Sequence, residues 1–210
     1  IEKHGSLSER VDYRVDVGGS GENFARKVTI SRTNGDDHEI FSDQLGNAYK
    51  EISETHGTTT RKHSVWGELI ENSLLTPDGE EQKSVYSYYP EGRLQTATET
   101  HSDSAVSTTS YRYDDCTDEI LSGQANIAGK PCFVERIDHL TGTTYRRASL
   151  YNNKGQVSKR AIQTTVGSTA VQYDIIDTHT SSQQVDERTY QPHPDLIAQG
   201  IEPFTIKYEY

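Results

Sequence analysis

The chain repeats a short pattern in which a tyrosine-rich stretch runs into a glycine turn. The clearest copy is Tyr86-Ser-Tyr88-Tyr89-Pro-Glu-Gly92-Arg93-Leu94. The turn position recurs at Gly19, Gly46, Gly67, Gly92, Thr117, Gly155 and Asp177, with spacings of 27, 21, 25, 25, 38 and 22 residues. A near-regular period of this size is typical of stacked supersecondary units. The sequence therefore predicts a repeat protein, and such arrays usually build surfaces or containers rather than catalytic clefts.

Weaker copies keep only parts of the pattern. They are Tyr13 with Asp16, Asp43 before Gly46, Tyr111 and Tyr113 with Asp114, Tyr151 before Gly155, and Tyr173 with Asp174. A second series of glycines lies between the first, at Gly35, Gly57, Gly79, Gly142 and Gly167. Two turns in each unit indicate two short strands in each unit. We therefore expect one repeat array over residues 1–210, made of about seven degenerate units of 21–27 residues.

The residues between the turns favour strands. Tyr, Val, Ile and Thr suit a pleated, half-buried surface, and Asp or Asn followed by Gly supplies hairpin-turn chemistry. Apolar and polar residues alternate, as in Phe204, Ile206 and Tyr208 against Thr205 and Lys207, which gives each strand one apolar face. We predict an all-β fold, a repetitive antiparallel β-meander of about a dozen strands in one curved, spiral sheet. An ordinary β-sandwich with a polar exterior is the alternative.

These motifs resemble the Rhs family, also called YD-repeat proteins. The motif of that family has a Tyr-x-Tyr-Asp front, two variable residues and then Gly-Arg/Asn-Leu, with a second turn of Asp-Pro-x-Gly type midway. Tyr86 to Leu94 match this motif with Tyr89 in the Asp position, Tyr111 to Asp114 match the front, and Thr76-Pro-Asp-Gly79 is similar to the second turn. The resemblance implies a bacterial protein whose repeats form a β-shell, often around a C-terminal toxin; related repeats occur in insecticidal toxin complexes and in teneurins.

Composition limits the function classes. The formal net charge is −11, and phosphate binding needs a basic patch, so nucleic acid is not an expected partner. No apolar run approaches the length of a membrane span. Leu, Ile, Val and Phe make up only 40 of 210 residues, which suits a thin sheet with one tyrosine-lined face. We expect Tyr86, Tyr88, Tyr111, Tyr113, Tyr151 and Tyr173 to form an aromatic ladder on that face.

Two segments interrupt the repeat. The first, about residues 117–131, is flanked by Cys116 and Cys132, the only two cysteines. A pair that brackets one insertion predicts a disulfide in an oxidising compartment, worth about 3 kcal/mol in the chain-entropy model; two buried free thiols are the alternative. The second segment, about residues 182–203, is rich in proline and polar residues and predicts a loop.

Catalytic and cofactor signals are weak, and we expect no enzyme activity, cofactor or metal. Asp36-Asp37-His38-Glu39 lacks the layout of a calcium-binding EF-hand and is interpreted as a solvated turn. His56 and His63 are interpreted as polar residues of a threonine-rich hairpin, with metal binding as the lesser alternative.

Two functional hypotheses follow. The first is a non-catalytic structural segment of a larger secreted or cell-surface protein, with the rest of that polypeptide and an enclosed toxin domain as partners. The second is an extracellular module that binds carbohydrate or a surface partner through exposed tyrosines and the two insertions.

Overall fold

The computed structural model describes residues 11–18, 25–32, 37–114 and 129–210. These residues form fifteen strands and one short helix, α1 (Pro194–Ile197). The strands are β1 (Val11–Val17), β2 (Arg26–Arg32), β3 (His38–Ser42), β4 (Ala48–Ser53), β5 (Gly57–His63), β6 (Leu69–Leu75), β7 (Glu81–Tyr88), β8 (Leu94–His101), β9 (Ser104–Tyr113), β10 (Pro131–Asp138), β11 (Thr143–Tyr151), β12 (Val157–Val166), β13 (Thr169–His179), β14 (Val185–Pro192) and β15 (Phe204–Lys207).

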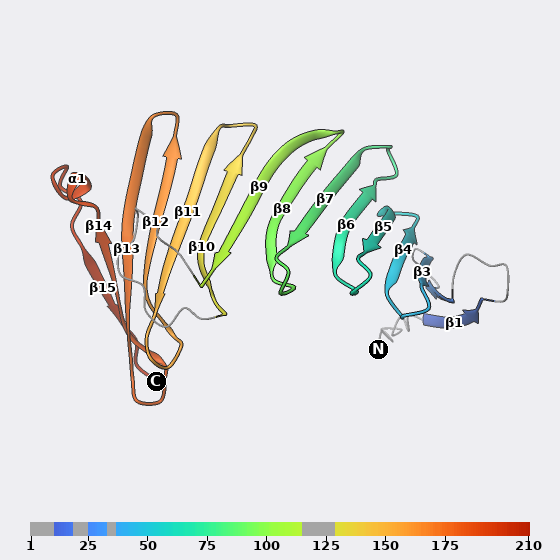
Figure 1. Cartoon of the computed structure of the whole chain (residues 1–210), viewed down its shortest axis with the longest axis horizontal. Helices are drawn as coiled ribbons and strands as arrows, with labels where there is room; N and C mark the ends of the chain where they lie inside the picture. Colours follow the sequence, from blue (N-terminus) through green and yellow to red (C-terminus); the bar gives the residue numbers. More distant parts are fainter. Residues whose placement is uncertain (1–10, 19–24, 33–36, 115–128) are drawn as a thin grey trace, which may run out of the picture. The chain divides into compact units, whose positions relative to one another are not determined.

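All fifteen strands belong to one antiparallel sheet in which each strand is hydrogen-bonded to its neighbours in sequence (Figure 1). The predicted all-β meander is confirmed. The strand number exceeds the expected dozen, because the structure places a strand on nearly every stretch between two turns. No helix in the described part of the chain is long and apolar enough to span a membrane.

Six hairpin turns share one hydrogen-bond pattern. In each, the backbone N–H of the first residue donates to the carbonyl of the fifth, and the N–H of the fourth donates to the carbonyl of the first. The turns are 43–47, 64–68, 76–80, 89–93, 152–156 and 180–184. This is the three-residue hairpin loop, a type I turn followed by a residue of positive φ that forms a bulge. Gly46 has φ of 87°, whereas Gln183 fills the same position with φ of 70°.

The first residue of these turns explains the polar position of the repeat motif. Asp43 Oδ1 accepts the backbone N–H groups of Leu45 and Asn47, both at 2.9 Å. Asn152 Oδ1 accepts those of Lys154 and Gln156 in the same way, both at 3.0 Å. A side-chain oxygen at this position satisfies backbone donors that the turn leaves unpaired. The Asp of the motif is therefore a turn residue.

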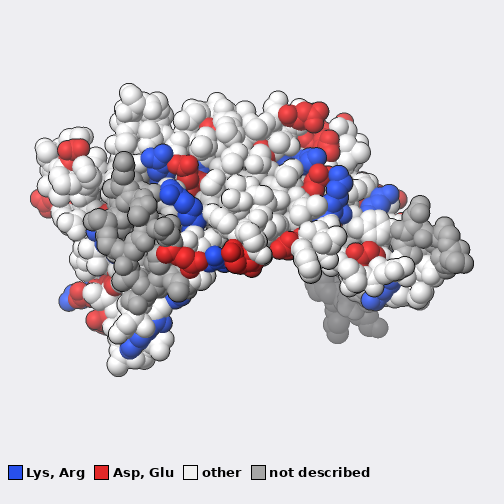
Figure 2. Space-filling view, viewed as in Figure 1, with Lys and Arg blue, Asp and Glu red and all other residues white. Residues whose placement is uncertain are grey.

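The chain divides into two compact units. Unit 1 comprises Ile1–Ser87 with Glu99–Ser104, and unit 2 comprises Tyr88–Thr98 with Ala105–Tyr210. A single array over residues 1–210 stays a prediction. On the visible face, basic side chains lie beside acidic ones (Figure 2).

Buried apolar side chains cluster in unit 2. Phe133 of β10 pairs with Ala148 of β11, and Ala148 pairs with Ala161 of β12. These three residues and Cys132 form one cluster, against which Leu150 and Tyr151 pack. The small alanines let the phenylalanine ring lie close to the sheet, and this is where unit 2 buries its apolar surface.

Two sequence predictions about the last third of the chain are wrong. Residues 182–203 are not one loop, because β14 occupies Val185–Pro192 and α1 follows it. Asp177 is not a turn residue; it lies within β13, which is eleven residues long, and the turn comes at 180–184. The 117–131 segment lies mostly outside the described residues.

Candidate functional site

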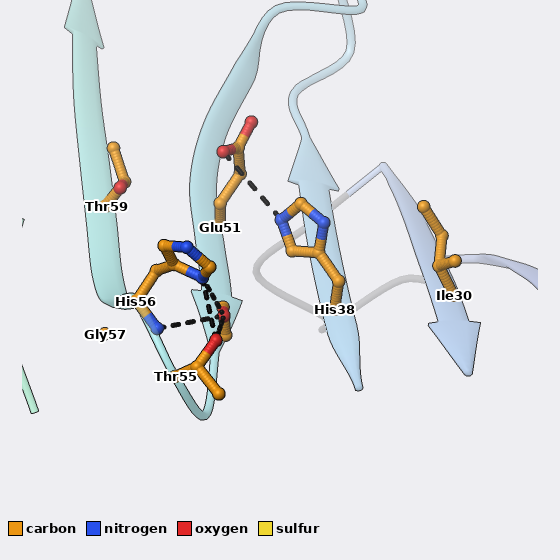
Figure 3. A pocket seen from close by; sticks show the side chains of 8 residues that line it. Ile30, His38, Glu51, Thr55, His56, Gly57 and Thr59 are labelled. Carbon is orange, nitrogen blue, oxygen red and sulfur yellow. Dashed lines mark hydrogen bonds and ion pairs between the residues drawn. The ribbon is translucent and has the colours of Figure 1, made fainter. Parts of the chain in front are cut away.

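A histidine-lined pocket of about 380 Å³ lies on unit 1. Strand register builds it: Ile30 of β2 pairs with His38 of β3, His38 with Ser53 of β4, and Ser53 with Gly57 of β5. Glu51 and Thr59 form the next row on the same face, and His56 enters from the turn between β4 and β5 (Figure 3). Strand pairing creates this pocket, since its residues are spread over thirty positions of sequence.

Glu51 is the charged centre of this pocket. Arg61 Nη1 donates to Glu51 Oε1 at 2.8 Å, and His38 Nε2 lies 3.9 Å from Glu51 Oε2. The hydrogen bond from Arg61 holds the pKa of the Glu51 carboxyl below its usual range, and burial opposes that shift. A carboxylate that is already paired with a guanidinium is a weak general base.

His56 is bound to its own turn. Its Nδ1 lies 2.8 Å from Thr55 Oγ1 and 3.2 Å from Ser53 Oγ, and its backbone N–H donates to Ser53 Oγ at 3.1 Å (Figure 3). The Ser53–His56 contacts join residues three positions apart in one exposed turn and are local turn chemistry. Within the described residues, no group of three His, Cys, Asp or Glu side chains could hold a metal ion.

His38 and His56 share this pocket, a result that the sequence did not predict. The sequence paired His56 with His63 instead. His56 precedes β5 and His63 ends it, so that pair occupies opposite ends of one strand. The sequence interpreted His38 as part of a solvated turn, whereas it is the first residue of β3.

An aromatic groove of about 290 Å³ lies on unit 2. Tyr173 of β13 pairs with Pro192 of β14, and Tyr190 of β14 pairs with Phe204 of β15. The rings of Tyr190 and Phe204 stack, with centroids 4.6 Å apart and an interplanar angle of 12°. Leu196, Ile201 and Glu202 complete the lining from the segment between β14 and β15.

Hydrogen bonds fix that segment over the groove. The His193 N–H donates to the Gln172 carbonyl at 3.0 Å, which ties the start of α1 to β13. The Ile201 N–H donates to the Leu196 carbonyl at 3.1 Å. The second interruption of the repeat is therefore an ordered wall of the groove.

A buried charge cluster lies beside the groove. Asp177 is 6% exposed. Its Oδ1 accepts Arg188 Nε at 2.7 Å, and its Oδ2 accepts Arg188 Nη2 at 3.1 Å and Arg160 Nη1 at 3.3 Å. This bidentate pairing raises the pKa of the Arg188 guanidinium. A buried carboxylate needs such partners because it has lost its hydration.

The structure places most of the motif residues at strand ends and turns. Tyr86 and Tyr88 lie at the end of β7, Tyr111 and Tyr113 at the end of β9, and Tyr151 at the end of β11. Gly46, Gly67, Gly92 and Gly155 have positive φ, as does Asp114. Arg93 follows Gly92, pairs with Asp114 and lies over the Tyr113 ring, and Leu94 begins β8.

Other motif residues lie elsewhere. Tyr13 and Asp16 belong to β1, and Gly19 lies outside the described residues. Tyr173 and Asp174 lie in the middle of β13, so they do not occupy the position equivalent to Tyr151. Asp174 instead pairs with Lys159 of β12 at 2.6 Å.

The tyrosine ladder stays a prediction. Tyr113 meets Tyr89 edge-on, with ring centroids 6.0 Å apart. Two tyrosine hydroxyls reach carbonyls of other strands: Tyr89 donates to Tyr111 of β9 at 3.0 Å, and Tyr151 of β11 donates to Pro131 of β10 at 2.8 Å. The motif tyrosines therefore connect strands through hydroxyl groups as well as through rings.

The predicted disulfide cannot be placed from the described residues, because Cys116 lies outside them. Cys132 is buried in β10, and its Sγ lies 3.5 Å from the Arg112 carbonyl oxygen. The Cys116–Cys132 bond stays a prediction, which mass spectrometry under non-reducing conditions would test.

Comparison with known proteins gives only distant similarity. No protein-family model matches the chain, and no curated protein sequence matches it. A crystal structure of TcdB2-TccC3 is similar at 13% identity and a TM-score of 0.34, covering 96% of this chain and 14% of that chain. TcdB2-TccC3 without its hypervariable C-terminal region is similar at 13% identity and a TM-score of 0.25, with the same coverage. The chain thus spans about 14% of the length of these structures.

Proposed function

We propose that this chain is a non-catalytic structural segment of a larger secreted or cell-surface Rhs/YD-repeat protein. Its strands contribute to a β-shell that encloses or presents a C-terminal toxin or effector domain. The rest of that polypeptide and the enclosed domain are its partners. This role needs no cofactor or metal.

The recurrence of one turn geometry carries this proposal. Six hairpins have the same pair of backbone hydrogen bonds, and strand order follows sequence order through fifteen strands. A sheet built by adding one hairpin after another can extend over a large area, because each hairpin needs only its neighbours. Such a sheet is suited to forming the wall of a β-shell.

Electron cryomicroscopy of the full-length natural protein tests the proposal. The strands of this chain should form part of a continuous β-wall around an enclosed density. Fractionation of the producing cells should find the protein outside the cytoplasm. A full-length protein in which this sheet stands alone, with no further repeats beside it, would contradict the shell role.

A second candidate function is an extracellular binding module for carbohydrate or a surface partner. The aromatic groove of unit 2 favours it, because Tyr173, Tyr190 and Phe204 meet there beside the ordered segment after β14. Aromatic rings offer flat apolar faces to a ligand. A glycan array tests this candidate: a Tyr173→Ser variant should lose the signal, and a Tyr145→Ser variant, changed at an exposed tyrosine of β11, should keep it.

A further inference from the structure

The aromatic groove contains a single charged side chain. Its lining is three aromatic rings, three aliphatic side chains and the carboxylate of Glu202. Among the described residues, Glu202 forms no ion pair, whereas most other carboxylates of the β12–β15 strands have a basic partner. A negative charge without a partner next to aromatic rings selects for positive ligands.

The groove is open to a ligand. Phe204 is 57% exposed, Ile201 48% and Tyr173 36%. The stacked pair of Tyr190 and Phe204 forms one fixed wall, and Tyr173 stands on the next strand. Exposed apolar side chains gathered in this way mark a binding surface more often than isolated ones do.

The chemistry of the lining discriminates between ligand classes. A sugar presents many hydroxyls and needs many hydrogen-bond partners, whereas the polar groups of the lining side chains are two tyrosine hydroxyls and one carboxylate. A neutral apolar ligand makes no use of Glu202. A quaternary ammonium ion has an apolar surface, a positive charge and no N–H group, so it suits aromatic faces with a nearby carboxylate.

We propose that the aromatic groove of unit 2 binds a quaternary ammonium ion of the trimethylammonium class. Tyr173 and Phe204 contact the methyl groups, and Glu202 supplies the opposite charge. Arg188, two residues before Tyr190 on β14, is paired with Asp177, as is Arg160 of β12. This inference rests on the second candidate function, since it names the ligand class of the same groove, and it is independent of the shell role.

Calorimetric titration with choline chloride tests the proposal, with 3,3-dimethylbutan-1-ol as the neutral ligand of the same shape. The protein should bind choline at least about tenfold more tightly than the alcohol. A Glu202→Gln variant should weaken choline binding about tenfold and leave alcohol binding unchanged. A Glu209→Gln variant, which removes a carboxylate outside the groove lining, should bind choline as the unchanged protein does.

The aromatic contribution has its own variant. Tyr173→Leu keeps an apolar side chain and removes the ring, so it should weaken choline binding while the circular dichroism spectrum stays the same. Equal affinity for choline and the alcohol, or no effect of Glu202→Gln, would overturn the proposal. Glycan binding without choline binding would overturn it too and would leave the binding-module function standing.

Discussion

The two units of this chain form the same kind of strand and stabilise it differently. Among the described residues of unit 1, only Ser73 is buried. Unit 2 buries an apolar group on its central strands: Cys132, Phe133, Ala148, Ala161, Ile162 and Ile175. Backbone hydrogen bonds are common to both units, so the difference lies in the side chains.

Charges follow the same division. In unit 1, ion pairs connect neighbouring strands at half-exposed positions. For example, the Glu71 carboxylate oxygens lie 2.8 Å from Lys62 Nζ and 3.0 Å from Lys83 Nζ. In unit 2, Asp177 is buried between two arginines. Exposed pairs contribute little to stability, whereas a buried carboxylate is costly to leave without partners. Backbone hydrogen bonds therefore stabilise most of the polar sheet of unit 1, whereas buried side-chain contacts are concentrated in unit 2.

Truncation of a buried aromatic ring should give the largest difference in stability cost between the two units. Phe133→Ala removes a 3%-exposed side chain and leaves a cavity over Ala148, so it should cost about 3 kcal/mol. Phe41→Ala in unit 1 removes a half-buried ring and should cost about 1 kcal/mol. Peptide-level hydrogen exchange should show that Phe133→Ala lowers protection on β10–β12 and that Phe41→Ala lowers it on β3–β4. Equal losses would mean that the cluster is not a core.

Neutralising the buried carboxylate should have the next largest effect. Asp177→Asn leaves Arg160 and Arg188 without a negative partner and should cost about 3 kcal/mol of unfolding free energy. Glu51→Gln in unit 1 also breaks a pair with arginine, but it should cost less than about 1 kcal/mol because water reaches that pair. Denaturant unfolding measures both. A cost for Glu51→Gln as large as that for Asp177→Asn would contradict the contrast in burial.

Turn glycines give a matched test inside unit 1. Gly57 and Gly46 have φ of 91° and 87°. A Cβ on Gly57 would lie 2.1 Å from the Leu75 carbonyl oxygen, whereas one on Gly46 would meet nothing within 4 Å. Gly46→Ala should cost about 1 kcal/mol from backbone strain alone, and Gly57→Ala should cost about twice as much. Similar melting temperatures for the two variants would show that the β4–β5 turn can move away from β6.

The sequence predicted the hairpins because turn chemistry is local. Asp43, Asn152 and the glycines three residues after them specify a turn wherever they stand. Prediction from the repeat spacing failed at Asp177, which spacing alone placed at a turn although it lies within β13. Its neutralisation by Arg160 and Arg188 depends on the register of three strands, which no local pattern encodes.

The sequence did not predict the histidine-lined pocket or the aromatic groove, because each depends on strand register. His38 and His56 are eighteen residues apart and share a pocket only because β3, β4 and β5 pair in one register. Tyr190 and Phe204 stack across β14 and β15, although the sequence predicted a loop before Phe204. The strand alternation through Phe204, Ile206 and Tyr208 was the available signal for that groove.

Acid should weaken unit 1 by a small amount. The hydrogen bond from Arg61 lowers the pKa of Glu51, and hydrogen bonds from Lys62 and Lys83 lower the pKa of Glu71. A carboxyl whose folded pKa lies below its unfolded value of about 4.3 stabilises the fold at higher pH. That contribution is lost as the pH falls through the folded pKa. Each pair should account for less than about 1 kcal/mol.

Hydrogen-exchange protection factors at pH 5 and pH 3 measure this loss. Protection should fall on β4–β7, where both carboxylates and their partners lie, more than on β11–β12, where Ala148 and Ala161 are buried. A Glu51→Gln, Glu71→Gln double variant should be weaker at pH 5 and should lose little more at pH 3, because its side chains do not titrate. If the unchanged protein lost protection equally on both sets of strands, the exposed ion pairs would not be what distinguishes unit 1.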